Sequence, residues 1–115
     1  MRRTVRTSFA YAGWPARVAA DLDAARAAIA AQDLPALGAL AEANCLALHA
    51  LMWTARPPLV YQRPATLQAM HDIWAARADG LRVWFTMDAG PNLKLLVAAP
   101  DLPPLRVRLP LLRPL

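Results

Sequence analysis

The sequence has few of the residues from which most catalytic and metal sites are built. Its 115 residues include one cysteine, two histidines and four glycines. A single cysteine excludes an intrachain disulfide and favours a reducing compartment. The chain has no glycine-rich phosphate loop, no Cys/His pair at metal-ligand spacing and no nucleophile elbow. We therefore expect neither a metal site nor a nucleotide-binding site within this chain.

Long uninterrupted apolar runs are also missing. Charge or proline breaks each apolar stretch well short of the roughly 20 residues that span a bilayer. The basic N-terminus lacks the adjoining apolar core of a signal peptide. We expect a cytoplasmic protein without a membrane contact. The net charge is +5, but the arginines are dispersed along the chain, so we expect no nucleic-acid partner.

Alanine, leucine and proline are plentiful instead. An apolar share of 57% allows one core in a chain of this length. Eleven prolines exclude an uninterrupted helical bundle. Those at positions 103, 104, 110 and 114 argue against a regular helix or a central strand near the C-terminus. We divide the chain into one domain over residues 1–99 and a proline- and leucine-rich tail over residues 100–115, extended or poorly ordered.

Three helices are expected in the first 80 residues. They begin near Pro15, Pro35 and Pro64, because proline is tolerated in the first turn of a helix and not in its interior. Apolar residues recur at helical spacing in each of them. The second helix ends near Trp53, and Gly80 suits the left-handed position that follows the third.

The second helix carries a few side chains whose role is open between chemistry and packing. From Cys45 to Trp53 the helix is apolar nearly all round, which indicates burial on more than one side. Asn44 and His49 are the polar exceptions. No Glu or Cys lies at ligand spacing from His49, so we expect both to be core residues with hydrogen-bond partners. Cys45 is expected to be a small buried side chain.

After residue 80 the period of the apolar pattern changes to two. Residues 81–87 alternate, with their apolar face toward the helices, and residues 93–99 alternate again. The intervening Asp88–Asn92 is rich in turn-forming residues, so the two strands are expected to pair antiparallel. The pattern therefore indicates an α+β fold in which helices pack on a small antiparallel sheet.

Asp88 is the sharpest chemical candidate. It directly follows the first strand, and Arg82 and Lys94 are expected nearby. A single well-placed carboxylate can serve as a general base toward a substrate hydroxyl. Aspartate is also a common turn former, so a structural role stays open from the residues alone. A lone carboxylate cannot bind and transfer a phosphoryl group, which requires an anion cradle.

Six segments of the chain form a familiar series in order and spacing, over roughly residues 2–98. They are Arg2–Ser8, Trp14, Glu42–Ala50, Pro57–Tyr61, Met70 and, most specifically, Trp84–Leu96 with its D-A-G-P-N element. This series resembles the diphosphomevalonate (mevalonate pyrophosphate) decarboxylases of the galactokinase, homoserine kinase, mevalonate kinase and phosphomevalonate kinase superfamily. The resemblance implies an incomplete copy of that superfamily's C-terminal domain, related to the ferredoxin-like split βαβ arrangement.

The resemblance also implies an activity. The family converts mevalonate 5-diphosphate, with ATP and Mg²⁺, to isopentenyl diphosphate, CO₂, ADP and phosphate in isoprenoid (lipid) biosynthesis. Asp88 would be its catalytic carboxylate, a base toward the tertiary 3-hydroxyl, and Ala89, Gly90 and Pro91 would support the substrate loop. The family's ATP loop, catalytic lysine and diphosphate-binding residues lie in an N-terminal part that has no counterpart here.

We therefore expect a C-terminal decarboxylase fragment that is inactive alone and binds neither ATP nor Mg²⁺ tightly. Uncovered sheet edges and apolar faces favour a homodimer or other self-association. Two alternatives stay open. A phosphomevalonate decarboxylase would differ only in the absent part, and a non-catalytic interaction module would not use the Asp88 carboxylate. A mevalonate 3-kinase fits less well, because the resemblance implies that such kinases lack this aspartate.

Overall fold

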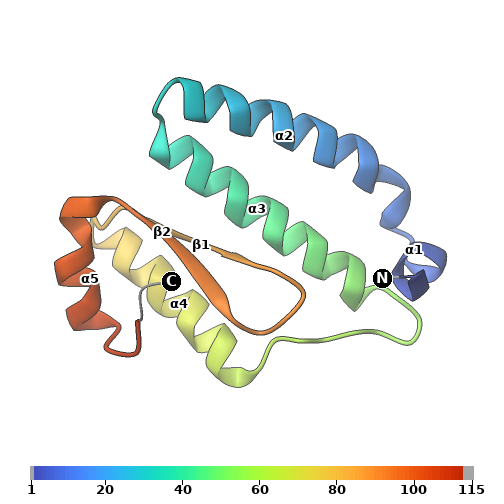
Figure 1. Cartoon of the computed structure of the whole chain (residues 1–115). Helices are drawn as coiled ribbons and strands as arrows, with labels where there is room; N and C mark the ends of the chain where they lie inside the picture. Colours follow the sequence, from blue (N-terminus) through green and yellow to red (C-terminus); the bar gives the residue numbers. More distant parts are fainter. Residues whose placement is uncertain (1, 113–115) are drawn as a thin grey trace.

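The computed structural model describes residues 2–112, and in it helices surround a two-stranded hairpin (Figure 1). The antiparallel pair α2 and α3 lies above the hairpin in that view, and α4 lies below it. This arrangement confirms the α+β class. In chain order the elements are α1 (Arg2–Thr7), η1 (Tyr11–Gly13), α2 (Trp14–Ala30), α3 (Leu34–Trp53), α4 (Pro64–Ala78), β1 (Val83–Met87), β2 (Leu93–Val97), η2 (Ala99–Asp101) and α5 (Leu102–Arg108).

Local sequence signals determine where the helices begin and end. The Asp33 carboxylate caps α3 by accepting a hydrogen bond from the backbone N–H of Ala36 at 2.9 Å. Such a cap satisfies one of the N–H groups that the first helical turn leaves without a partner. After α4, Gly80 has a φ of 98°, a left-handed conformation that favours glycine. Both signals confirm the expected helix boundaries.

The hairpin places alternate side chains of β1 in the core. The strands pair antiparallel, with Val83 opposite Val97, Phe85 opposite Leu95 and Met87 opposite Leu93, as expected. Side chains of β1 that face the helices exclude water together with residues of α3, α4 and α5. The buried cluster comprises Cys45, Met70, Ile73, Ala76, Val83, Phe85, Met87 and Leu105.

Trp84 shows that β1 is covered on its second face as well, although the alternation predicted cover on one face only. Its indole is 7% exposed, and a Cβ on Gly38 of α3 would overlap the ring. The glycine therefore lets α3 pass directly over the strand. The Arg77 guanidinium lies 5.8 Å from the centre of the Trp84 ring, within the range of a cation–π contact.

Side chains, rather than a further strand, close the outer edge of β1. The Glu42 carboxylate on α3 accepts a hydrogen bond from the Phe85 N–H at 3.3 Å. The Arg77 guanidinium on α4 donates to the Val83 carbonyl at 3.0 Å. Buried backbone groups need such partners, because an unpaired one is costly. β1 is thus a completed edge strand, a feature that the sequence patterns did not predict.

The segment after residue 100 differs from the extended or poorly ordered tail that was expected. η2 and α5 occupy residues 99–108. Pro103 and Pro104 lie in the first turn of α5, where a missing N–H breaks no intrahelical hydrogen bond. Leu105 is fully buried in the core cluster. The prediction was therefore wrong for Leu102–Arg108, and the part of the predicted tail at residues 113–115 lies outside the described residues.

By length and composition alone, α3 could cross a membrane, with a mean hydropathy of 1.3 over its apolar window. The uninterrupted apolar runs of the sequence did not indicate this property of α3. The polar residues of α3 nevertheless have partners inside the fold. Glu42 and His49 are buried against the β1 side of the hairpin, and the Asn44 side-chain amide donates to Asp21 of α2 at 2.8 Å. Such contacts are typical of a helix in a protein core.

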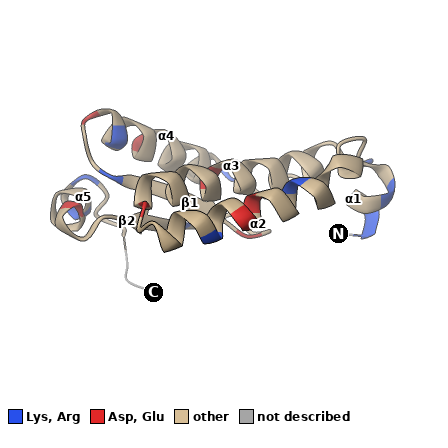
Figure 2. Cartoon of the chain, turned by 90° about the horizontal axis from the view of Figure 1, so that it is seen from above, with Lys and Arg blue, Asp and Glu red and all other residues tan. Residues whose placement is uncertain are grey.

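Charged side chains are scattered over the elements (Figure 2). α1 carries Arg2, Arg3 and Arg6 and no acidic residue. Several other arginines pair with aspartates, as Arg17 does with Asp21. Exposed pairs of this kind contribute little to stability. The expected absence of a nucleic-acid partner stays a prediction.

Candidate active site

Asp88 is the first residue after β1, and its carboxylate points to solvent, with 81% of the side chain exposed. The Lys94 ammonium on β2 forms an ion pair with it. Lys94 is opposite Thr86 in the hairpin, and Asp88 follows Thr86 by two residues. Both charged groups therefore lie on one face of the sheet. The expected proximity of Lys94 to Asp88 is confirmed.

Arg82 is not part of this site, contrary to expectation. Its guanidinium and backbone N–H both donate to the Asp101 carboxylate, at 2.8 and 2.9 Å. Arg82 precedes β1, whereas Asp88 follows it. Six residues of extended chain separate the two by about 20 Å. The sequence pattern could not show that the two residues lie at opposite ends of the strand.

His49 holds the backbone of Asp88. Its imidazole is 1% exposed, and Nε2 lies 2.7 Å from the Asp88 carbonyl oxygen. A carbonyl only accepts, so Nε2 carries the proton and donates it. Nδ1 is buried and has no partner among residues 2–112. The prediction of a core histidine with hydrogen-bond partners is therefore confirmed at one ring nitrogen only.

Thr66 anchors the other end of the same turn. Its hydroxyl donates to the Pro91 carbonyl at 2.9 Å and accepts from the Arg63 N–H at 3.1 Å. The side chain is 6% exposed. Buried groups from α3 and α4 thus fix both ends of the turn that carries Asp88. The sequence patterns did not reveal this role, although a threonine three residues after the N-cap residue Arg63 is a recognisable capping signal.

Three further loop residues were expected to support the substrate loop. They lie between the two anchored positions of the turn or at one of them. Ala89 and Gly90 are exposed, and Pro91 is half-buried. A Cβ on Gly90 would meet no atom within 4 Å, so nothing within residues 2–112 requires glycine there. The expected roles of Ala89, Gly90 and Pro91 in supporting a substrate loop stay predictions.

Glu42 is a buried carboxylate behind the site. Its oxygens accept from Trp74 Nε1 at 2.6 Å and from both guanidinium nitrogens of Arg77 at 2.9 Å. Burial raises its pKa, but the hydrogen bonds from Arg77, Trp74 and the Phe85 backbone outweigh burial, so the pKa lies below its ordinary value. Glu42 therefore stays ionised and structural.

Cys45 lies one helical turn further along α3 and is 2% exposed. Burial raises the pKa of its thiol to about 11, although a hydrogen bond with the Met87 backbone works in the opposite direction. A thiol with this pKa is protonated at neutral pH and is a poor nucleophile. The expectation of a small buried side chain is confirmed.

The described residues do not fit a nucleotide–magnesium site. Within residues 2–112, no group of three His, Cys, Asp or Glu side chains could hold a metal ion. A groove of about 310 Å³ lies between α2 and α3 beside Thr86, but alanine and leucine contribute most of its lining. Asp88 is paired with Lys94. What the site offers is one oriented, exposed carboxylate on a fixed turn.

Comparisons with known proteins identify this arrangement. The model of the mevalonate 5-diphosphate decarboxylase C-terminal domain matches residues 1–110. The mevalonate diphosphate decarboxylase from Enterococcus faecalis superposes with a TM-score of 0.91 at 45% identity, over 95% of this chain and 34% of that one. The mevalonate pyrophosphate decarboxylase from Streptococcus pyogenes gives 0.88 at 36% identity, over 93% and 34%.

A further solved relative, MDDEF in complex with MVAPP, AMPPCP and magnesium, gives a TM-score of 0.89 at 46% identity, over 93% of this chain and 33% of that one. A comparison with curated protein sequences finds no significant match. The chain spans about a third of the length of its solved relatives. The family match covers all of the helices and both strands, so the chain belongs to the mevalonate 5-diphosphate decarboxylase family and corresponds to that family's C-terminal domain.

Proposed function

We propose that this chain supplies the catalytic carboxylate of an ATP-dependent mevalonate 5-diphosphate decarboxylase, with Asp88 as the base. The observation that carries the proposal is the exposed Asp88 carboxylate on a turn whose backbone is fixed by His49 and Thr66. A base must be held at hydrogen-bond distance from the proton that it removes. The two anchors restrict the main chain, and the carboxylate, paired with Lys94, stays exposed to an incoming substrate.

In the proposed reaction, Asp88 accepts the proton of the substrate's tertiary 3-hydroxyl. The hydroxyl oxygen then forms a bond to the γ-phosphorus of ATP, and ADP leaves. Loss of the new phosphate group and of CO₂ leaves the double bond of isopentenyl diphosphate. A tertiary alcohol is a weak and hindered nucleophile, so oriented proton removal assists the attack.

We also propose that the chain is inactive by itself and acts in the cytoplasm. The described residues provide no metal cluster, and the solved relatives are about three times as long, since this chain covers 34% of one of them. ATP and Mg²⁺ would be bound by the complementary part of such an enzyme. The single, buried cysteine suits a reducing compartment.

A chimaera tests the proposal. This chain would replace the matching third of the Enterococcus faecalis enzyme, which is 45% identical to it. We expect ATP-dependent release of CO₂ from mevalonate 5-diphosphate by the chimaera and none by the 115-residue chain. Asp88→Asn should lower turnover by about 10³-fold or more, because the base contributes on that scale.

Asp72→Asn provides the matched control, because Asp72 lies on α4 and bonds only to Gln68 among the described residues. It should leave turnover unchanged. Turnover by the Asp88→Asn chimaera close to that of the parent would overturn the base assignment. Release of CO₂ by the isolated chain would overturn the proposed inactivity.

A further inference from the structure

Asp88 has a fixed main chain but an exposed side chain, so the backbone anchors alone do not aim its carboxylate. His49 and Thr66 hold the two ends of the turn, whereas 81% of the Asp88 side chain is exposed. Rotation about the Cα–Cβ bond of such a side chain has three staggered positions. Within residues 2–112, the carboxylate has one hydrogen-bond partner, the Lys94 ammonium, which contacts Oδ2. Among the described residues, Lys94 is therefore the group placed to select one of these positions.

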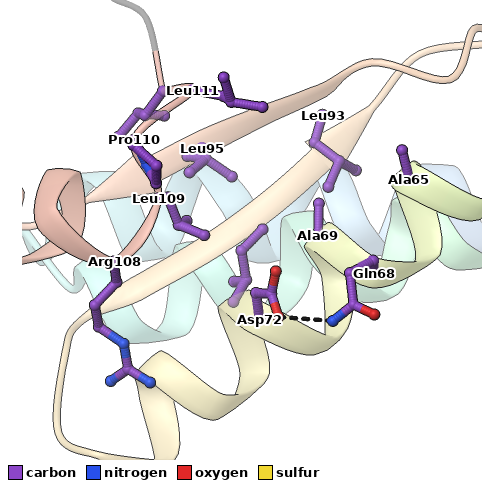
Figure 3. A pocket seen from close by; sticks show the side chains of 12 residues that line it. Ala65, Gln68, Ala69, Asp72, Leu93, Leu95, Arg108, Leu109, Pro110 and Leu111 are labelled. Carbon is purple, nitrogen blue, oxygen red and sulfur yellow. Dashed lines mark hydrogen bonds between the residues drawn. The ribbon is translucent and has the colours of Figure 1, made fainter.

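The alternation of β2 directs Lys94 to the face that carries Asp88. Figure 3 shows Leu93 and Leu95 pointing toward α4, into an apolar groove of about 420 Å³. Successive side chains of a strand point to opposite faces of the sheet. Lys94 lies between these two leucines, so it projects away from the groove. The core packing of its neighbours thus determines where the ammonium can reach.

The main chain of Lys94 is also held in place. The Phe85 N–H points away from β2, to Glu42 on α3. Backbone groups alternate in direction along a strand, so those of Thr86 point toward β2, where Lys94 lies opposite. Both partners of the ion pair with Asp88 therefore extend from backbone that the fold fixes.

The ion pair leaves one oxygen of the Asp88 carboxylate open. Oδ2 contacts Lys94, and Oδ1 has no partner within residues 2–112. A carboxylate is planar and accepts protons along the lone pairs of its oxygens, so holding Oδ2 also sets the direction of Oδ1. The ammonium in addition offsets part of the negative charge, which would otherwise repel an incoming phosphoryl group. Orientation and charge therefore both suit a base that works beside a phosphate.

We propose that Lys94 is a positioning residue for the decarboxylase reaction, because its ammonium orients the Asp88 carboxylate so that Oδ1 meets the tertiary hydroxyl of the substrate. This inference rests on the proposed role of Asp88 as the base. Lys94 acts only through Asp88 and touches no reacting atom. A carboxylate that rotates freely spends much of its time in unproductive orientations. Loss of Lys94 therefore lowers turnover and leaves substrate binding unchanged.

A second ion pair beside β1 provides a matched control. Arg82 donates to Asp101 at 2.8 Å, and 53% of its side chain is exposed, against 47% for Lys94. Exposed pairs of this kind contribute little to stability. Lys94→Met and Arg82→Met should therefore both leave the urea midpoint of the 115-residue chain close to that of the parent. The two variants each remove one exposed ion pair, but only Lys94→Met removes it from Asp88.

Steady-state kinetics of the chimaera with the Enterococcus faecalis enzyme test the proposal. We expect Lys94→Met to lower kcat by about 10- to 100-fold, the scale of a misplaced catalytic group, at an unchanged KM for mevalonate 5-diphosphate. Lys94→Arg should recover most of the loss, because a guanidinium keeps the charge and the donors. Arg82→Met should turn over as the parent does. In the Asp88→Asn background, Lys94→Met should cost no further turnover, because no carboxylate is left to orient.

The kinetic outcomes separate this proposal from the proposed function. Parent turnover in Lys94→Met, with Asp88→Asn inactive, would overturn the role of Lys94 alone. A raised KM at an unchanged kcat would also overturn it, because Lys94 would then bind substrate directly. An equal loss with and without the Asp88 carboxylate would exclude an effect through that residue. Parent turnover in Asp88→Asn would overturn the base assignment, and the role of Lys94 would fall with it.

Nuclear magnetic resonance of the 115-residue chain provides a measurement that does not depend on activity. Three-bond couplings to the Cβ protons of Asp88 report how its side chain is distributed over the staggered positions. We expect one dominant position in the parent and in Arg82→Met, and averaged couplings in Lys94→Met. Averaged couplings in the parent would overturn the proposal, and so would a single position that persists in Lys94→Met.

Discussion

The Nε2 atom of His49 lies 2.7 Å from the carbonyl oxygen of Asp88, so a buried side chain of α3 holds the main chain of the proposed base. His49→Leu would leave that carbonyl without its donor. We expect the free energy of unfolding to fall by about 1–3 kcal/mol, the usual cost of removing one partner of a buried hydrogen bond. Amide exchange across residues 88–92 should accelerate in the same variant.

The matched comparisons for this tether are His49→Gln and Asp88→Asn. The glutamine amide can donate from a position close to Nε2, so it should recover part of the lost stability. Asp88→Asn changes an exposed carboxylate and should alter stability by less than about 0.5 kcal/mol. Urea unfolding measures both effects. Unchanged stability and exchange in His49→Leu would show that the contact does not hold the turn.

Acid should destabilise the fold partly through Glu42. Its pKa in the folded protein lies below the ordinary value of 4.5, so the unfolded chain binds the proton more readily. The stabilisation is therefore present above pH 4.5 and is lost as the pH falls through the folded pKa. The pKa of Asp101 is also lowered, by hydrogen bonds from Arg82, so Asp101 contributes to the same loss of stability at acid pH.

The variant Glu42→Gln isolates this carboxylate. It should lower stability at neutral pH by about 3 kcal/mol, because the partly buried Arg77 loses its charged partner. It should also show a shallower loss of stability between neutral and acid pH than the parent. Urea titrations at a series of pH values measure both. Asp23→Asn, at an exposed position, should reproduce the parent's pH profile; an equal slope in Glu42→Gln would contradict the assignment.

Alkaline pH should act through Cys45. Its thiol pKa is raised from 9.0 to about 11, so the unfolded chain releases the proton at lower pH than the folded protein does. The associated stability is present below pH 9.0 and is lost as the pH rises toward 11. Cys45→Ala should flatten that part of the stability profile. A disulfide reagent should label Cys45 at the rate of unfolding, and fast labelling of the folded protein would refute its burial.

Gly38 should tolerate no side chain. Gly38→Ala would press a methyl group into the rigid Trp84 indole, and we expect a loss of about 1–3 kcal/mol, as for other overpacked cores. Gly13→Ala is the matched control, because a Cβ at Gly13 meets nothing within 4 Å. Its effect should stay within about 0.5 kcal/mol. Thermal unfolding of the two variants decides between a packing requirement and a general preference for glycine.

Local signals predicted the parts of the fold that depend on neighbouring residues. The start of α3 near Pro35, the Gly80 stop and the turn after Asp88 each arise within a few positions of the chain. The role of Glu42 could not be predicted in this way, because its partner Phe85 lies 43 residues away. A hydrogen bond between a side chain and the backbone also produces no periodic pattern in the sequence. Pro103 led to the wrong prediction of an extended tail, because the effect of a proline depends on its position in a helix.

The completion of β1 by α3 has a consequence for the order of folding. The hairpin turn from Met87 to Leu93 closes a short loop, whereas the contact between His49 and Asp88 closes one of 39 residues. Closing a longer loop costs more chain entropy, and such contacts form late in slow-folding topologies. We therefore infer that the hairpin forms first and α3 docks onto it afterwards. Substitutions at His49 should accelerate unfolding far more than they slow refolding.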